Sequence, residues 1–141
     1  MSDFTLTATV PQPFDAVVDR VLDLLTDAGF GVLTEIDLQA TLRAKLGVEV
    51  PPQVILGACR PQLAHRALEA DPRVATMLPC NVVVADAGEG CTRVEVFDPA
   101  AMVAFSDAPD LAPVADEARE RLSGMIKALT GEREDSDAAR A

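Results

Sequence analysis

The sequence is poor in aromatic residues, histidine and lysine. Its 141 residues include five Phe but no Trp or Tyr, with one His and two Lys. The core therefore has to be built from Val, Leu, Ile and Ala, within an apolar fraction of 49%. A Ser–His–Asp triad would depend on His65, the single histidine, and no nucleophile stands in a fitting context. A P-loop, a GxGxxG turn and a GxSxG elbow are also absent, which excludes the common nucleotide-binding and hydrolase templates.

Positive charge is scarce as well, and the formal net charge is −11. Binding to nucleic acids or anionic membranes begins with Lys and Arg on phosphates, so we expect neither as a partner. No stretch approaches the roughly 18 uninterrupted apolar residues of a membrane helix. Met1 to Phe4 lack the features of a signal peptide. Together with three cysteines, an odd number typical of reduced thiols, these features predict a cytoplasmic protein.

The apolar pattern alternates between the periods of strands and helices. Residues 4–10 alternate apolar side chains with Thr, which predicts a strand, whereas residues 14–28 carry a helical stripe at i, i+3, i+4 and i+7. The run Val82–Val84 predicts a central strand buried on both faces. Asp37 and Asp110 are predicted to cap helices. The full set of predicted strands is 4–10, 30–36, 53–59, 81–85 and 91–97, and the predicted helices are 14–28, 38–46, 61–70 and 110–129.

This mixture of strands and helices, with a hairpin turn at residues 87–90, predicts an α+β fold. We expect a two-layer sandwich, with helices packed on one face of a mostly antiparallel or mixed sheet. Residues 1–130 are expected to form a single domain. Residues 131–141 are charged and small, and they are expected to form a disordered acidic tail.

The most suggestive segment for chemistry runs from Cys59 to Asn81. Cys59 ends a predicted strand just before a predicted helix, whose N-terminal end carries partial positive charge. A thiol in that position, beside Arg60, is expected to have a lowered pKa. His65 follows on the same helix, and Cys80 opens the next strand beside Asn81. These five residues form the candidate ligand or redox site.

The directions of two strands decide whether this site assembles. If the strands that end at Cys59 and begin at Cys80 are antiparallel, both cysteines lie at one edge of the sheet. If the strands are parallel, the cysteines lie at opposite edges and cannot act together. The connection of about twenty residues between them permits either arrangement.

Three interpretations of the segment remain open. In the first, Cys59 and Cys80 are small buried hydrophobic residues and His65 is a surface residue. In the second, Cys59 is a reactive thiolate and Cys80 its resolving partner. In the third, Cys59, His65 and Cys80, joined by Met102, bind a soft metal or a haem-type group. Zinc is disfavoured, because a closed zinc site needs four ligands at recognised spacing and no CxxC is present.

Several segments resemble the domain-of-unknown-function family 302. They are residues 29–37 (GFGVLTEID), 55–61 (ILGACRP), 64–68 (AHRAL), 78–84 (LPCNVVV), and Asp98–Pro99 followed by Met102. The similarity extends over residues 4–129, roughly the whole predicted domain. The resemblance implies a small α+β domain that forms a dimer, and it supplies no settled activity. The family pattern often has Asn between the Cys and the Pro, where this chain has Arg60.

These observations lead to two expectations about function. The first is a small-molecule-binding or thiol-active domain with its site at Cys59–Asn81, a binding protein rather than an enzyme. The alternative is an interaction module that forms a homodimer and uses its cysteines only for packing. The sequence names no cofactor.

Overall fold

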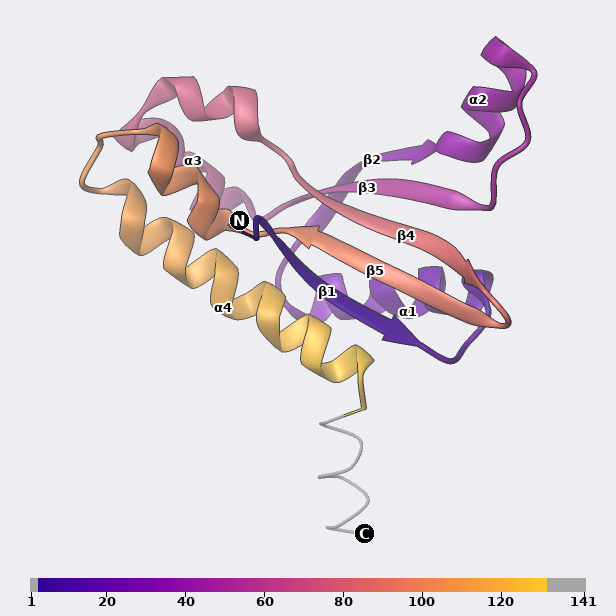
Figure 1. The fold of residues 1–141 in the computed structure, drawn as a ribbon. Helices are drawn as coiled ribbons and strands as arrows, with labels where there is room; N and C mark the ends of the chain where they lie inside the picture. Colours follow the sequence, from indigo (N-terminus) through magenta and orange to yellow (C-terminus); the bar gives the residue numbers. More distant parts are fainter. Residues whose placement is uncertain (1–2, 132–141) are drawn as a thin grey trace, which may run out of the picture.

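The computed structural model of the chain describes residues 3–131, so nearly all of the predicted tail at 131–141 lies outside the described residues (Figure 1). Its strands are β1 (Thr5–Val10), β2 (Gly31–Asp37), β3 (Gln53–Cys59), β4 (Cys80–Gly88) and β5 (Cys91–Phe97). Its α-helices are α1 (Phe14–Asp27), α2 (Leu38–Leu46), α3 (Pro61–Ala70) and α4 (Leu111–Leu129). Two 3-10 helices, η1 (Pro72–Met77) and η2 (Pro99–Phe105), connect them. None of the helices in this described part is long and apolar enough to cross a membrane.

The five strands form one sheet in the order β1-β5-β4-β3-β2, and every neighbouring pair is antiparallel. The predicted α+β class and antiparallel sheet are therefore confirmed. β4 is the central strand, as its valine run indicated. The expectation that it is buried on both faces is wrong, because Val82 and Val84 are fully buried whereas Val83 is only half-buried. Val83 lies on the sheet face opposite the main core.

The main hydrophobic core fills the space between one face of the sheet and the helices α1 and α4 (Figure 1). The stripe predicted for α1 supplies Val17, Val21 and Leu25, all fully buried. The C-terminal half of α4 adds Leu122 and Met125. Burial of one apolar stripe per helix is what stabilises such short amphipathic helices, because their intrinsic propensity is small.

A second apolar cluster lies beyond the end of the sheet where β3 stops and β4 starts. Its members come from α3, η1, η2 and the N-terminal half of α4: Leu63, Ala67, Val74, Met102, Leu111, Val114 and Ala118. The long helix α4 thus serves two cores, with its first half in this cluster and its second half against the sheet.

Polar capping differs between the two helices for which it was expected. Asp37 caps α2 as predicted, since its Oδ1 accepts a hydrogen bond of 2.9 Å from the Ala40 N–H. Asp110 precedes α4 but makes no side-chain capping bond, so that part of the prediction is wrong. Its backbone already has αR angles, φ −80° and ψ −6°, rather than the extended conformation of a typical N-cap.

Candidate functional site

The antiparallel pairing of β3 and β4 brings Cys59 and Cys80 to the same end of the sheet. Ala58 is the cross-strand partner of Cys80, and Cys59 is the next residue of β3. The arrangement that permits a joint site is therefore the one found. All three cysteines of the chain lie among the described residues and are free thiols, with Cys80 buried and Cys59 half-buried.

Cys59 and Cys80 line one apolar cavity of about 40 Å³ between the end of the sheet and the second apolar cluster. The thioether of Met102 lines it from η2, so three sulfur-bearing side chains surround the space. The other lining residues are Phe30, Ala58, Arg60, Leu63, Ala64, Ala67, Leu78, Pro99, Leu111, Val114, Ala115 and Ala118. The volume exceeds what one water molecule needs. It is far below the roughly 300–1,000 Å³ of pockets for large ligands, so the cavity in this conformation does not accommodate a haem.

Burial governs the acidity of both thiols. It raises the pKa of Cys59 above the ordinary value for a cysteine. It also raises the pKa of Cys80 to about 11, with the nearby Cys59 thiolate as a second, smaller cause. The lowered pKa expected for Cys59 is therefore not found, because loss of hydration disfavours the charged form. Both thiols are neutral near pH 7, which is unfavourable for a reactive thiolate.

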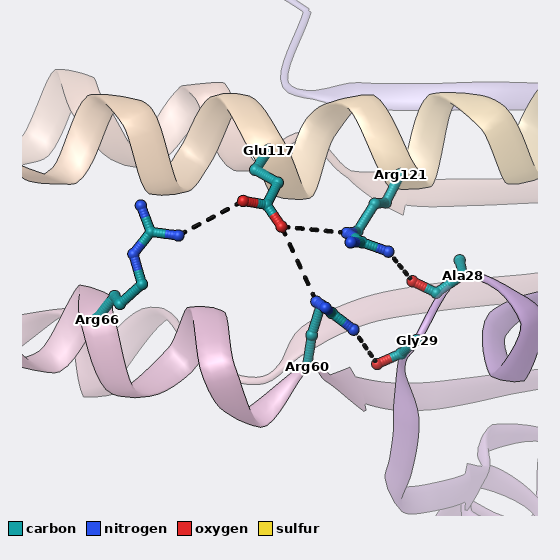
Figure 2. Close-up of polar contacts among 6 residues, drawn as sticks. All are labelled: Ala28, Gly29, Arg60, Arg66, Glu117 and Arg121. Atoms are coloured by element: carbon teal, nitrogen blue, oxygen red, sulfur yellow. Dashed lines mark hydrogen bonds and ion pairs between the residues drawn. The ribbon is translucent and has the colours of Figure 1, made fainter.

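The Arg60 side chain is turned toward the C-terminal end of α1 and toward α4 (Figure 2). Its Nη1 donates a hydrogen bond of 3.3 Å to the carbonyl oxygen of Gly29. Its Nε lies 4.0 Å from Glu117 Oε2, is buried, and makes no hydrogen bond among the described residues. Arg60 thus lines the cavity while its guanidinium contributes to a polar clamp.

Glu117 is the centre of this clamp, which joins three helices (Figure 2). Its carboxylate accepts hydrogen bonds from Arg121 Nε at 3.3 Å and from Arg66 Nη1 at 3.4 Å. Arg121 Nη1 in turn donates to the Ala28 carbonyl oxygen at 2.9 Å. The carbonyl groups at the end of a helix have no partner within the helix and carry partial negative charge. Arg60, the residue before α3, and Arg121 of α4 satisfy the carbonyl groups of Gly29 and Ala28 here, and so hold the end of α1 against α4 and the start of α3.

Two of the five candidate residues are not part of the cavity. The His65 side chain is 76% exposed, and its Nδ1 lies 3.8 Å from Glu69 Oε1 one turn further along α3. Asn81 is exposed and pairs across the sheet with Gly57. The proposed ligand set of Cys59, His65 and Cys80 is therefore not assembled. Within residues 3–131 no group of three or more His, Cys, Asp and Glu side chains could hold a metal ion.

Sequence reasoning missed how α4 and η2 close the cavity. Ala115 and Ala118 lie on the apolar stripe of α4, and their small side chains leave the space open. Small residues in an otherwise large apolar stripe are the one local signal of such a space. Nothing local indicates that this part of α4 lies over the end of β3, because the two are about fifty residues apart in sequence.

Comparisons with known proteins agree with the architecture. The family model described as "Domain of unknown function DUF302" matches residues 6–129. The crystal structure of an uncharacterised conserved DUF302 protein from Bacillus stearothermophilus is similar to this chain, with a TM-score of 0.82 and 29% sequence identity. The similarity covers 91% of this chain and 99% of that one. No curated protein matches the chain. The chain therefore belongs to the DUF302 family of domains of unknown function.

Proposed function

We propose that this domain binds a small apolar ligand in the cavity beside Cys59 and Cys80. The observation that carries the proposal is a cavity of about 40 Å³ lined almost wholly by apolar side chains, at the junction of the sheet with α3, η2 and α4. Native interiors are close-packed, and voids larger than a water molecule are few. An apolar cavity of this kind stays dry and takes up small apolar molecules.

Binding is favoured over thiolate chemistry by the electrostatics of the site. Burial raises the pKa of Cys59 and raises that of Cys80 to about 11, so both thiols keep their protons near pH 7 and are poor nucleophiles. Neutral thiols and the Met102 thioether are polarizable and make favourable contacts with apolar and aromatic groups. The three sulfur-bearing side chains therefore suit a soft, weakly polar ligand.

Arg60 is the one charged residue that lines the cavity, and its guanidinium is directed to Gly29 and Glu117. Its Nε is buried and has no hydrogen-bond partner within residues 3–131; the distance of 4.0 Å to Glu117 Oε2 is longer than a hydrogen bond. A buried donor without a hydrogen bond costs stability, but this atom has almost no accessible surface and is turned to Glu117, so it is not available to a ligand in the cavity. The apolar wall therefore favours a ligand without strongly polar groups.

The proposal is tested with xenon, an apolar atom small enough for the cavity, by following backbone amide chemical shifts under xenon pressure. We expect shifts to change around Cys59, Cys80 and Met102. Ala64→Leu, which adds side-chain volume at the cavity wall, should abolish these changes. Ala16→Leu, the same substitution at an exposed position of α1, should preserve them. Unchanged shifts around the cavity in the wild-type chain would overturn the proposal.

The second candidate, that the domain is an interaction module that forms a homodimer, is favoured by a different observation. Exposed apolar side chains occur along β2 and the segment that follows it: Val32, Leu33, Ile36, Leu46 and Val48. Both functions are compatible in one molecule, because α2 lies at the tip of the β2–β3 hairpin whereas the cavity lies at its other end, where Gly31 pairs with Cys59 (Figure 1).

A further inference from the structure

One wall of the cavity is the 3-10 helix η2, which forms a single layer between the cavity and solvent. Its Pro99 and Met102 are buried and line the cavity. Residues 103–105, at the end of the same helix, are exposed. Phe105, at 73% exposure, is the most exposed large hydrophobic residue of the described chain. Displacement of η2 would therefore open the cavity directly to solvent.

The other walls of the cavity are held more firmly than η2. The end of the sheet and α4 belong to the two apolar cores. The wall formed by α3 is an α-helix of ten residues, and a hydrogen bond from Arg66 to Glu117 ties it to α4. In contrast, η2 continues for seven residues as a 3-10 helix, in which hydrogen-bond geometry is poorer and runs longer than about four residues are uncommon. Because η2 buries just Pro99 and Met102, it is the wall that opens at the lowest cost.

The start of η2 is anchored by Asp98. Its Oδ1 accepts a hydrogen bond of 2.9 Å from the Ala100 N–H, and its Oδ2 accepts one of 3.1 Å from Arg119 Nε on α4. The Asp98 N–H also donates to the carbonyl oxygen of Phe4, at 2.8 Å, just before β1. The sheet, α4 and η2 are thus joined at Asp98, and this end of η2 is suited to serve as a pivot.

The other end of η2 is tied to a distant part of the chain. Ser106 Oγ donates a hydrogen bond of 2.7 Å to Asp71 Oδ2, at the junction of α3 and η1. Asp71 also accepts hydrogen bonds from the Arg73 side chain, which hold its carboxylate in place. A hydrogen bond to an ionised group is stronger than one between neutral groups. We call this bond between Ser106 and Asp71 the latch, because it connects η2 to the segment between α3 and η1.

We infer that η2 is the lid of the cavity, which pivots at Asp98 when the latch breaks and moves Met102 away from the cavity. The inference rests on the proposed ligand function for its purpose, because it names the route by which a ligand enters. Met102 suits the moving side of the wall, since the unbranched and flexible side chain of methionine adapts to different packing. The sheet and α4 keep their own apolar contacts when the latch breaks, so the lid opens without unfolding of the domain.

The test uses Cys80 as the reporter, because this residue lines the cavity and is 7% exposed. Methyl methanethiosulfonate is added to the full chain, and the modification of each cysteine is followed by mass spectrometry of peptide fragments. In Ser106→Ala, which removes the latch, Cys80 should be modified about tenfold faster than in the wild-type chain, the effect of losing a hydrogen bond to a charged group. Ser123→Ala, the same substitution in the second half of α4, should leave the rate unchanged.

A variant in the main core separates opening of the lid from unfolding of the whole domain. Leu25→Ala removes a fully buried side chain of that core and lowers the free energy of global unfolding. If Cys80 is reached through the lid, its modification rate should not change in this variant. If Cys80 is reached through global unfolding, the rate should rise more than in Ser106→Ala. Hydrogen exchange gives a second readout: in Ser106→Ala the amides of η2 should exchange faster, while those of β5 should be unchanged.

Equal modification rates of Cys80 in the wild-type chain and in Ser106→Ala would overturn the inference. So would an acceleration by Leu25→Ala that matches or exceeds the acceleration by Ser106→Ala. Xenon binding decides the ligand proposal separately. Xenon-dependent shifts without faster modification of Cys80 would support the ligand and reject the lid, whereas faster modification without such shifts would support the opening of η2 and reject the ligand.

Discussion

The two ends of the β2–β3 hairpin have opposite environments. At one end, Ala58 is fully buried and Cys59 lines a cavity closed by three other elements. At the other end, β2 leads into α2, where no residue is buried. The same two strands therefore connect a region whose contacts lie within the chain to a region whose apolar surface is left open.

The two ends of the hairpin are held in place by different interactions. The cavity end is held by apolar burial in the second cluster and by the clamp of Arg60, Arg121 and Glu117. The segment from β2 through α2 is held by the caps of α2 and by the backbone pairing of β2 with β3 on one side only. Substitutions at the cavity end should therefore change the free energy of unfolding of the monomer. Substitutions in the segment from β2 through α2 should instead change association between chains.

The largest effect on stability is expected for Leu111→Ala at the cavity end. Leu111 is 1% exposed and lines the cavity, so its loss removes buried apolar surface and enlarges an existing void. Large-to-small changes at such sites cost about 2–5 kcal/mol. Urea unfolding followed by circular dichroism measures the change. A loss below about 1 kcal/mol would show that this cluster contributes little to folding.

Gly29→Ala should cost about 1–3 kcal/mol, the range for a residue with a side chain in a left-handed conformation. Gly29 has φ +89°, and a Cβ there would collide with Arg60 Nη1. The substitution therefore strains the backbone and also displaces the Arg60 side chain, which is part of the clamp. Gly90→Ala is the matched control, because Gly90 has φ +77° and no atom near its Cβ position. Equal losses in the two variants would mean that the clamp adds nothing.

Asp71 should make stability depend on pH in the acid range. Hydrogen bonds from Arg73 and Ser106 hold the pKa of its carboxyl well below the usual range. Its contribution is therefore present above the unfolded pKa of about 4 and is lost as the pH falls through the folded pKa. Asp71→Asn should be less stable than the wild-type chain at pH 7, with the difference shrinking on acidification. Asp23→Asn, at an exposed site on α1, is the matched control for the change of charge.

Cys59 should react slowly with iodoacetamide, several-fold slower than a small free thiol at pH 7. Burial raises its pKa, so less thiolate is present, and the cavity wall restricts access. Labelling is followed by mass spectrometry of the intact chain, with Cys80→Ala and Cys91→Ala substitutions to isolate Cys59. Labelling faster than the free thiol would restore the interpretation of Cys59 as a reactive thiolate.

The smallest effect on monomer stability is expected in the segment from β2 through α2. Leu46 is 68% exposed, so Leu46→Ala should change the free energy of unfolding by no more than about 0.5 kcal/mol in solutions dilute enough to dissociate any dimer. Unfolding at low and high protein concentration provides the comparison. A large loss in dilute solution would show that Leu46 packs within its own chain, contrary to the contrast between the two ends.

Local patterns were sufficient to predict most of the fold. The period of two and the helical stripe located β3 at 53–59 and α1 within one residue of its observed end, because those signals depend only on neighbouring residues. The relative direction of β3 and β4 depends on a long connection, and no local signal decides it. Val83 shows the same limit: an apolar run indicates a central strand but does not reveal that one face of the sheet is open.

The candidate site was predicted in part for a similar reason. Cys59 and Cys80 meet because antiparallel pairing places them there. His65 was included from its proximity in sequence, but Leu63 and Ala67 form the buried face of α3 and leave His65 turned to solvent. The pKa of Cys59 depends on burial by residues from η2 and α4, which sequence reasoning did not connect to it.

The measurement that bears most directly on the ligand proposal is diffraction from crystals of the full chain under xenon pressure. We expect a xenon peak in the cavity among the side chains of Cys59, Cys80 and Met102, and its loss in Ala64→Leu crystals. Xenon found only at other sites, with the cavity empty in the wild-type chain, would contradict the proposal that this domain binds a small apolar ligand there.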